Sequence, residues 1–188
     1  MEQLRPSSFK EYSEWYYQRE LRESKICQFP DNPFEAMKGN NGKKPQKENS
    51  KWHIVLLSRE EFENLIFYEC DGLINDKIVI STQGLNYRLL RNVAENANTF
   101  FYNKLPKPLN ERQERSFYYY KAFSENKIQL VGDNRIFILL ANDKEKQKNP
   151  VGKFYIKDGS GRTLAFMALL LQGKLKWSPV EAFFCESE

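Results

Sequence analysis

The feature that most constrains the fold is one run near the end of the chain, VGKFYIKDGSGRTLAFMALLLQG, residues 151–173. A β-rich segment leads into a turn with two glycines, and an apolar helix pattern follows. Another extended run covers residues 178–185. We expect the strand at 153–157 and the strand that ends at Cys185 to share one sheet. The helix from about Arg162 to Gln172 should pack four residues against that sheet, namely Leu164, Met167, Ala168 and Leu171.

Earlier segments repeat this alternation. Residues 52–58 predict a strand, the capping box of Ser58 and Glu61 predicts a helix through residue 69, and residues 77–81 predict another strand. Helix patterns follow at 85–103 and at 110–125, and β-rich runs follow at 127–131 and 135–141. A chain of 188 residues with 40% hydrophobic content suits one compact domain. The sequence therefore predicts an α/β (α+β) fold, a small mixed sheet with flanking helices.

The first 50 residues have a different character. A capping box of Ser8 with Glu11 opens an amphipathic, aromatic helix over residues 8–26, and the Pro, Gly, Asn and Lys of residues 29–50 predict a long exposed loop. We expect an N-terminal helix and loop, residues 1–50, and a core domain, residues 51–188. Aromatic clusters at 11–20 and 115–125 are interpreted first as packing surfaces and second as a protein-partner interface.

Charge and cysteine content limit the function classes. A net charge of +4, with both signs mixed along the chain, suits anionic small molecules and does not mark a nucleic-acid binder. Cys27, Cys70 and Cys185 lie far apart, which favours a reducing compartment. No stretch resembles a signal peptide or a membrane span, so we expect a cytoplasmic protein. With His53 as the lone histidine, neither a zinc site nor Ser-His-Asp hydrolysis is expected.

The glycine turn has the parts of an anion site. Glycines allow positive φ and close approach of a ligand, and the first N–H groups of the following helix point outward with the positive end of its dipole. An arginine fork and two hydroxyls suit phosphate, and an adjacent carboxylate can hold Mg²⁺. An ordinary strand–turn–helix junction has a similar composition, so both interpretations stay open. The predicted binding residues are Gly159, Ser160, Gly161, Arg162 and Thr163, with Asp158 for the metal.

The run from Phe154 to Gly173, followed by PVEAFF, resembles the closing segment of the ParB/sulfiredoxin superfamily. Members share a strand, a D-G-x-x-R or G-x-x-R turn, a helix that ends near Gly, and a strand that begins with Pro-Val. The resemblance covers the last quarter of the chain. It implies a ParB/sulfiredoxin-like core in which the turn and the helix N-terminus hold nucleotide phosphates. The matching residues are Asp158, Gly159, Arg162, Gly173, Pro179 and Val180.

Departures from the family patterns narrow the range of superfamily activities that we expect of this chain. Sulfiredoxins carry a reactive Cys and then a His where Ser160 and Gly161 stand, so sulfinic-acid reduction is not expected. Kinase-like members commonly have His within D-G-H-x-R, and this chain lacks it there. Partition proteins continue into a helix-turn-helix region, whereas this chain ends at Glu188, so we expect no DNA partner.

Two functions follow from the resemblance. The first is a nucleotide-phosphate-binding protein that uses ATP and Mg²⁺ for phosphotransfer to a small hydroxyl-bearing molecule, as free serine kinases do. The second is a non-catalytic ParB-like regulatory or protein-interaction module. The missing His favours this second function, whereas the intact Asp158, Gly159 and Arg162 favour the first. In the kinases an early acidic residue acts as base on the acceptor hydroxyl. From the acidic cluster between residues 60 and 71, the candidates for this role are Glu69 and Asp71.

Overall fold

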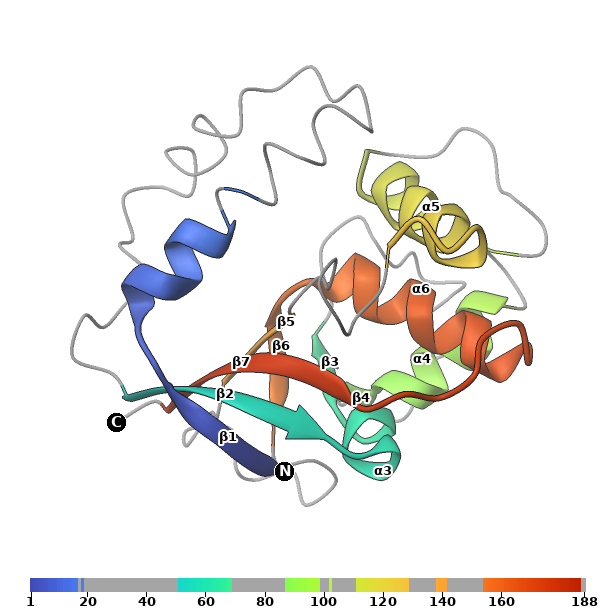
Figure 1. The fold of residues 1–188 in the computed structure, drawn as a ribbon. Helices are drawn as coiled ribbons and strands as arrows, with labels where there is room; N and C mark the ends of the chain where they lie inside the picture. Colours follow the sequence, from blue (N-terminus) through green and yellow to red (C-terminus); the bar gives the residue numbers. More distant parts are fainter. Residues whose placement is uncertain are drawn as a thin grey trace.

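The computed structural model describes residues 1–16, 18, 51–68, 87–98, 102, 111–128, 138–141 and 154–186. A mixed sheet and flanking helices make up this part of the chain (Figure 1), as the sequence predicts. Residues 9–16 form an N-terminal helical segment, which has no label in Figure 1. The helices labelled there are α3 (Arg59–Glu63), α4 (Leu90–Ala97), α5 (Glu111–Ser124) and α6 (Ser160–Leu171). The strands are β1 (Glu2–Ser7), β2 (Lys51–Leu57), β3 (Ile66–Tyr68), β4 (Tyr87–Leu89), β5 (Ile138–Ala141), β6 (Tyr155–Asp158) and β7 (Val180–Glu186).

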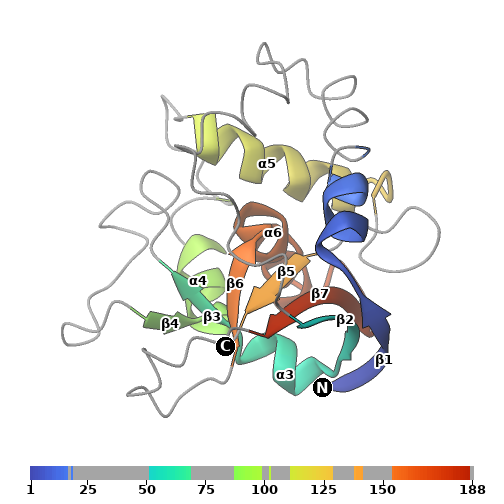
Figure 2. The same cartoon turned by 90° about the vertical axis from the view of Figure 1, so that its left-hand side faces the viewer.

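The seven strands lie in the order β1-β2-β7-β5-β6-β3-β4, which Figure 2 shows from right to left. Two neighbouring pairs, β5 with β7 and β3 with β6, are parallel, and the other neighbours are antiparallel. The prediction that the strands before and after α6 share one sheet is confirmed, with β5 between them. Each parallel pair brings the carboxyl ends of two strands to one edge of the sheet.

Both faces of the sheet are covered near β7, because alternate side chains of this strand belong to two different clusters. Val180, Ala182 and Phe184 belong to the main core under α4, α5 and α6, whereas Phe183 and Cys185 belong to a smaller cluster on the opposite face. Figure 1 shows α4, α5 and α6 grouped on one side of the sheet. The smaller cluster is completed by aromatic residues of the N-terminal helical segment. The sheet is therefore sandwiched at this point.

Helix α6 is the central helix of the main core. Its residues from Arg162 to Leu170 are all buried, so the helix is covered on every side and not on the single face predicted from the sequence. The helix ends in a Schellman motif, in which the N–H groups of Gly173 and Lys174 donate to the carbonyls of Leu170 and Leu169. Gly173 has a φ of 68°, which explains the glycine at this position.

A chain of side-chain hydrogen bonds holds α4, α5 and α6 together where α6 ends. Lys174 Nζ donates to the Tyr120 hydroxyl (2.9 Å), which donates to Gln172 Oε1 (2.6 Å). Gln172 Nε2 donates to Asn98 Oδ1 (2.7 Å), and Asn98 Nδ2 donates to the Ala168 carbonyl (3.1 Å). Because each donor has an acceptor, this polar chain is compatible with the surrounding apolar core.

Three short strands differ from the predictions. Residues 2–7 form β1 ahead of the predicted N-terminal helix, the helix predicted through residue 69 ends at Glu63 and is followed by β3, and Tyr87–Leu89 forms β4 where a helix was expected. β1 is held by pairing with β2, β3 by pairing with β6, and β4 by pairing with β3. Such tertiary pairing overrides local helix patterns.

Several predictions lie partly or wholly outside the described residues. These include the strand at 77–81, the loop at 29–50 and the helix beyond residue 18. The division of the chain at residue 50 stays a prediction. Within the described ranges, no helix is long and apolar enough to cross a membrane.

Candidate functional site

The predicted phosphate site lies in the turn between β6 and α6, at an edge where two parallel strands end. Ile66 of β3 pairs with Tyr155 of β6, so both strands deliver their carboxyl ends to this edge. The chain leaves β3 at Tyr68, directly before the predicted catalytic residues. Glu69 and Asp71 themselves, and the predicted metal ligand's side chain at Asp158, lie outside the described part of the structure.

Gly159 connects the strand to the helix in a left-handed conformation. Its φ is 94° and its ψ is 18°, and it occupies the N-cap position of α6 without any side chain to cap the helix. A residue with a Cβ is strained there, which confirms the expected need for glycine. The N-cap residue therefore provides no side-chain acceptor for the backbone N–H groups in the first turn of α6.

Gly161 does not have the positive φ that the sequence predicts for both glycines in the turn. Its backbone is helical, and among the described glycines only Gly159 and Gly173 have positive φ. A Cβ built on Gly161 would lie 3.6 Å from both Cα and Cβ of Ser116 in α5. The Ser116 hydroxyl also donates to the Gly161 carbonyl (3.3 Å). Helix α6 therefore lies close to α5 here, at a distance that a methyl group would still fit.

Thr163 uses both of its donors inside the chain. Its backbone N–H and its hydroxyl donate to the Gly159 carbonyl, at 2.9 and 2.7 Å. The side chain is fully buried. Thr163 therefore stabilises the turn and presents no donor to a ligand in this conformation, whereas Ser160 is only half-buried.

Arg162 is buried, with 2% of its surface exposed, so it does not lie on a solvated helix face. Its guanidinium carbon is 5.8 Å from the ring centroid of Trp15 and 5.8 Å from that of Tyr119. Both distances suit cation–π contact. One ring comes from the N-terminal helical segment and the other from α5. The predicted key residue thus joins α6 to two other elements.

A buried hydroxyl pair supports the start of α6 from α5. The Tyr102 hydroxyl and the Ser116 hydroxyl are 2.7 Å apart, and both residues are buried. Burial raises the pKa of the Tyr102 phenol well above its usual value. The Tyr102 ring also stacks on Tyr120 at 4.5 Å.

Four neighbours of the turn were not predicted as part of the site. Their types give no sequence signal for this role, because aromatic residues and serines are common in any packed helix. The first aromatic cluster and the run of tyrosines were interpreted as packing surfaces, and their described members do pack against the core. These four neighbours are Trp15, Tyr102, Ser116 and Tyr119.

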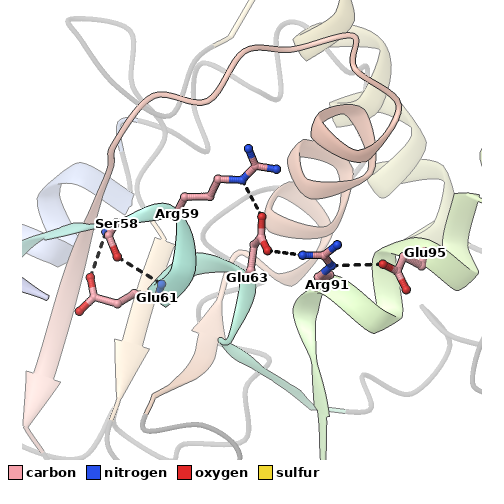
Figure 3. A network of polar contacts seen from close by, with 6 residues as sticks. All are labelled: Ser58, Arg59, Glu61, Glu63, Arg91 and Glu95. Carbon is pink, nitrogen blue, oxygen red and sulfur yellow. Dashed lines mark hydrogen bonds and ion pairs between the residues drawn. The ribbon is translucent and has the colours of Figure 1, made fainter.

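Two acidic residues of the early cluster, Glu61 and Glu63, have structural partners (Figure 3). Glu61 completes the predicted capping box with Ser58. Glu63 accepts from Arg59 (2.7 Å) and Arg91 (2.8 Å). Burial raises the pKa of the Glu63 carboxyl, but hydrogen bonds from the two arginines outweigh it, so the net pKa is lowered. Glu63 is therefore an ionised structural carboxylate that joins α3 to α4.

Two other reactive side chains, His53 and Cys185, lie on β2 and β7. No cluster of three or more His, Cys, Asp or Glu residues that could hold a metal occurs in the described ranges. His53 Nδ1 lies 2.6 Å from Gln3 Nε2, and His53 Nε2 lies 4.0 Å from Glu186. These contacts join β1, β2 and β7. Cys185 is a buried free thiol in β7.

No family model, curated protein or solved structure matches this chain.

Proposed function

We propose that this protein binds the phosphate groups of a nucleotide at the turn between β6 and α6. One observation carries the proposal: the carboxyl ends of β3 and β6 meet at the edge where the 12-residue helix α6 begins at a glycine N-cap. In open α/β sheets, ligands bind outside the carboxyl ends of parallel strands. Phosphate gains there from amide donors and from the helix dipole.

The sequence resemblance to the ParB/sulfiredoxin superfamily supports a nucleotide as the phosphate carrier. We propose ATP with Mg²⁺, with Asp158 beside the metal and with Ser160 and Gly161 nearest the phosphates. Phosphotransfer to a small hydroxyl-bearing acceptor follows if Glu69 or Asp71 acts as base. The compartment that we propose is the cytoplasm, where a free thiol such as that of Cys185 stays reduced.

A non-catalytic module is the second candidate, and the packing of the turn favours it. Arg162 and Thr163 each have a structural contact that accounts for the residue without a ligand. Such a protein keeps the fold and serves regulation or protein binding. Formation of ADP from ATP in the presence of amino acids and other small hydroxyl compounds separates the candidates, because only the first hydrolyses or transfers the γ-phosphate.

Titration of ATP, ADP and CTP, each with and without Mg²⁺, against wild type and Ser160→Asp tests the binding site. A carboxylate in the first turn repels phosphate but interacts favourably with the helix dipole, which is worth about 0.3–1 kcal/mol. We therefore expect the affinity to fall about tenfold or more while the fold is retained.

Ser124→Asp is the matched control, because Ser124 is exposed and lies about 12 Å along α5 from Ser116. It should bind as wild type does. Equal affinity in wild type and Ser160→Asp, or no binding by wild type at millimolar nucleotide, would refute the phosphate site.

A further inference from the structure

We infer that the N-terminal helical segment, residues 9–16, acts as an autoinhibitory strap over the phosphate site, with Trp15 as the residue that blocks Arg162. The inference rests on the proposed function and concerns its regulation. A phosphate that uses the guanidinium fork must reach it, yet only 2% of Arg162 is exposed when the segment is docked. Docking of the segment and binding of phosphate to Arg162 therefore compete.

The two rings beside Arg162 differ in how firmly they are held. Tyr119 is buried in α5, which packs on α6 through Ser116 and Gly161. Trp15 is only partly buried and belongs to a short helical segment. Short elements with few buried contacts open at lower free energy than the core. Release of Trp15 is therefore the easier way to expose Arg162.

Apart from the contact of Trp15 with Arg162, the ring contacts of the strap lie on the opposite face of the sheet from α6. Phe9 lies 5.9 Å from Trp52, Tyr12 stacks on Trp52 at 5.5 Å, and Trp15 lies 5.8 Å from Phe183. Among residues 9–16 only Tyr12 is buried. Glu11 also ties the start of the segment to β1, because it accepts hydrogen bonds from Arg5 (3.0 Å) and Ser7 (2.8 Å). A competing ligand therefore has to displace the Trp15 end of the segment to reach Arg162.

Docking of the strap and binding of the ligand affect each other reciprocally. A ligand that binds only the undocked state shifts the segment away from the sheet, and a mutation that weakens docking raises the apparent affinity for that ligand. If the docked state holds about 90% of the molecules, removal of the strap raises the affinity about tenfold.

Trp15→Leu tests this in the full chain, with ATP and Mg²⁺ as the probe. It removes the ring from Arg162 and keeps an apolar side chain on the sheet. We expect about tenfold tighter binding than in wild type. Trp177→Leu is the matched control, because Trp177 is also partly buried but packs on Phe62 and Phe166. Its affinity should equal that of wild type.

Phe9→Leu provides a second variant, should Trp15→Leu fail to fold. It weakens docking at Trp52 without a change beside Arg162, and it should also raise the affinity. Trp15 fluorescence, taken as wild type minus Trp15→Leu, should shift to longer wavelength as ATP saturates the wild type. A purely structural tryptophan would give no such shift.

The outcomes separate this inference from the proposed function. Equal or weaker binding by Trp15→Leu and Phe9→Leu, alongside measurable binding by wild type, overturns the strap and leaves the phosphate site standing. Absence of binding by wild type and by both variants at millimolar ATP overturns the proposed function and the strap with it. Binding by the variants but not by wild type supports both the strap and the proposed function.

Discussion

Arg162 is the residue at which a structural role in the core and the proposed binding role coincide. Its long side chain fills space between two aromatic rings. In our proposal, its charge becomes available for phosphate when Trp15 moves. A substitution at this position therefore changes both the core and the site. Stability and nucleotide affinity must be measured on the same variants.

Arg162→Ala should lower the free energy of unfolding by about 2–4 kcal/mol, because it leaves a cavity beside buried rings. Arg162→Lys should cost less, since lysine keeps the charge and most of the aliphatic stem. Urea denaturation of the three proteins gives both values. A loss of only a few tenths of a kcal/mol for Arg162→Ala would indicate a solvated side chain and contradict the structure.

Gly161 allows a sharper test of packing. In Gly161→Ala the new methyl group meets Ser116 at ordinary contact distance, 3.6 Å, and helix propensity favours alanine by about 0.5–1 kcal/mol. We expect unchanged or slightly higher stability. Gly161→Leu should be destabilised by about 1–3 kcal/mol, because its larger side chain pushes α5 away. Equal thermal midpoints for the two variants would argue against this close approach of α5.

At the scale of elements, the N-terminal strand and helical segment belong to the sheet's packing. β1 pairs with β2 from Glu2 to Ser7, and the helical segment covers the smaller cluster. Removal of residues 1–50 would expose that cluster, which consists of Trp52, Ile54, Phe183 and Cys185 besides Tyr12. An exposed apolar patch of this kind favours association.

We expect residues 51–188 alone to unfold at a lower temperature than the full chain and to bind a hydrophobic dye such as ANS. Thermal unfolding and dye fluorescence at two protein concentrations measure both effects. The same midpoint as the full chain, without dye binding, would mean that residues 1–50 are a dispensable extension.

The connection between α3 and α4 makes a prediction about pH. The lowered pKa of Glu63 means that its stabilising contribution is present above the ordinary glutamate pKa and is lost as pH falls through the lowered value. Glu63→Gln should therefore be less stable than wild type at pH 7. Urea midpoints of the two proteins should converge below about pH 4. A difference of constant size from pH 7 to pH 3.5 would contradict the ion-pair account.

At the scale of the whole molecule, sequence patterns predict the elements that are long or locally capped. The apolar run of α6, the aromatic run of α5 and the capping box at Ser58 locate three helices, and the β-rich runs locate β2, β5, β6 and β7. The short strands β1, β3 and β4 depend on partners far away in the chain, and β1 includes a proline and a register shift. No local period predicts such pairing.

The candidate site also has one feature that the sequence predicts and one that it does not. The left-handed Gly159 follows from the turn residues alone. The burial of Arg162 does not, because it depends on Trp15 and Tyr119, which lie more than 40 residues away in the sequence. A charged residue at a helix start usually lies at the surface, so only the three-dimensional packing reveals its surroundings.

The most direct test of the phosphate site is an NMR titration of the ¹⁵N-labelled full chain with ATP and Mg²⁺. Amides that bind phosphate change their chemical shifts more than distant ones. The account predicts the largest shifts at Ser160 and Gly161, with little change at Gln172 and Lys174 at the other end of α6. Absence of shifts at millimolar ATP, or shifts centred on Gln172 and Lys174 with Ser160 and Gly161 unchanged, would contradict it.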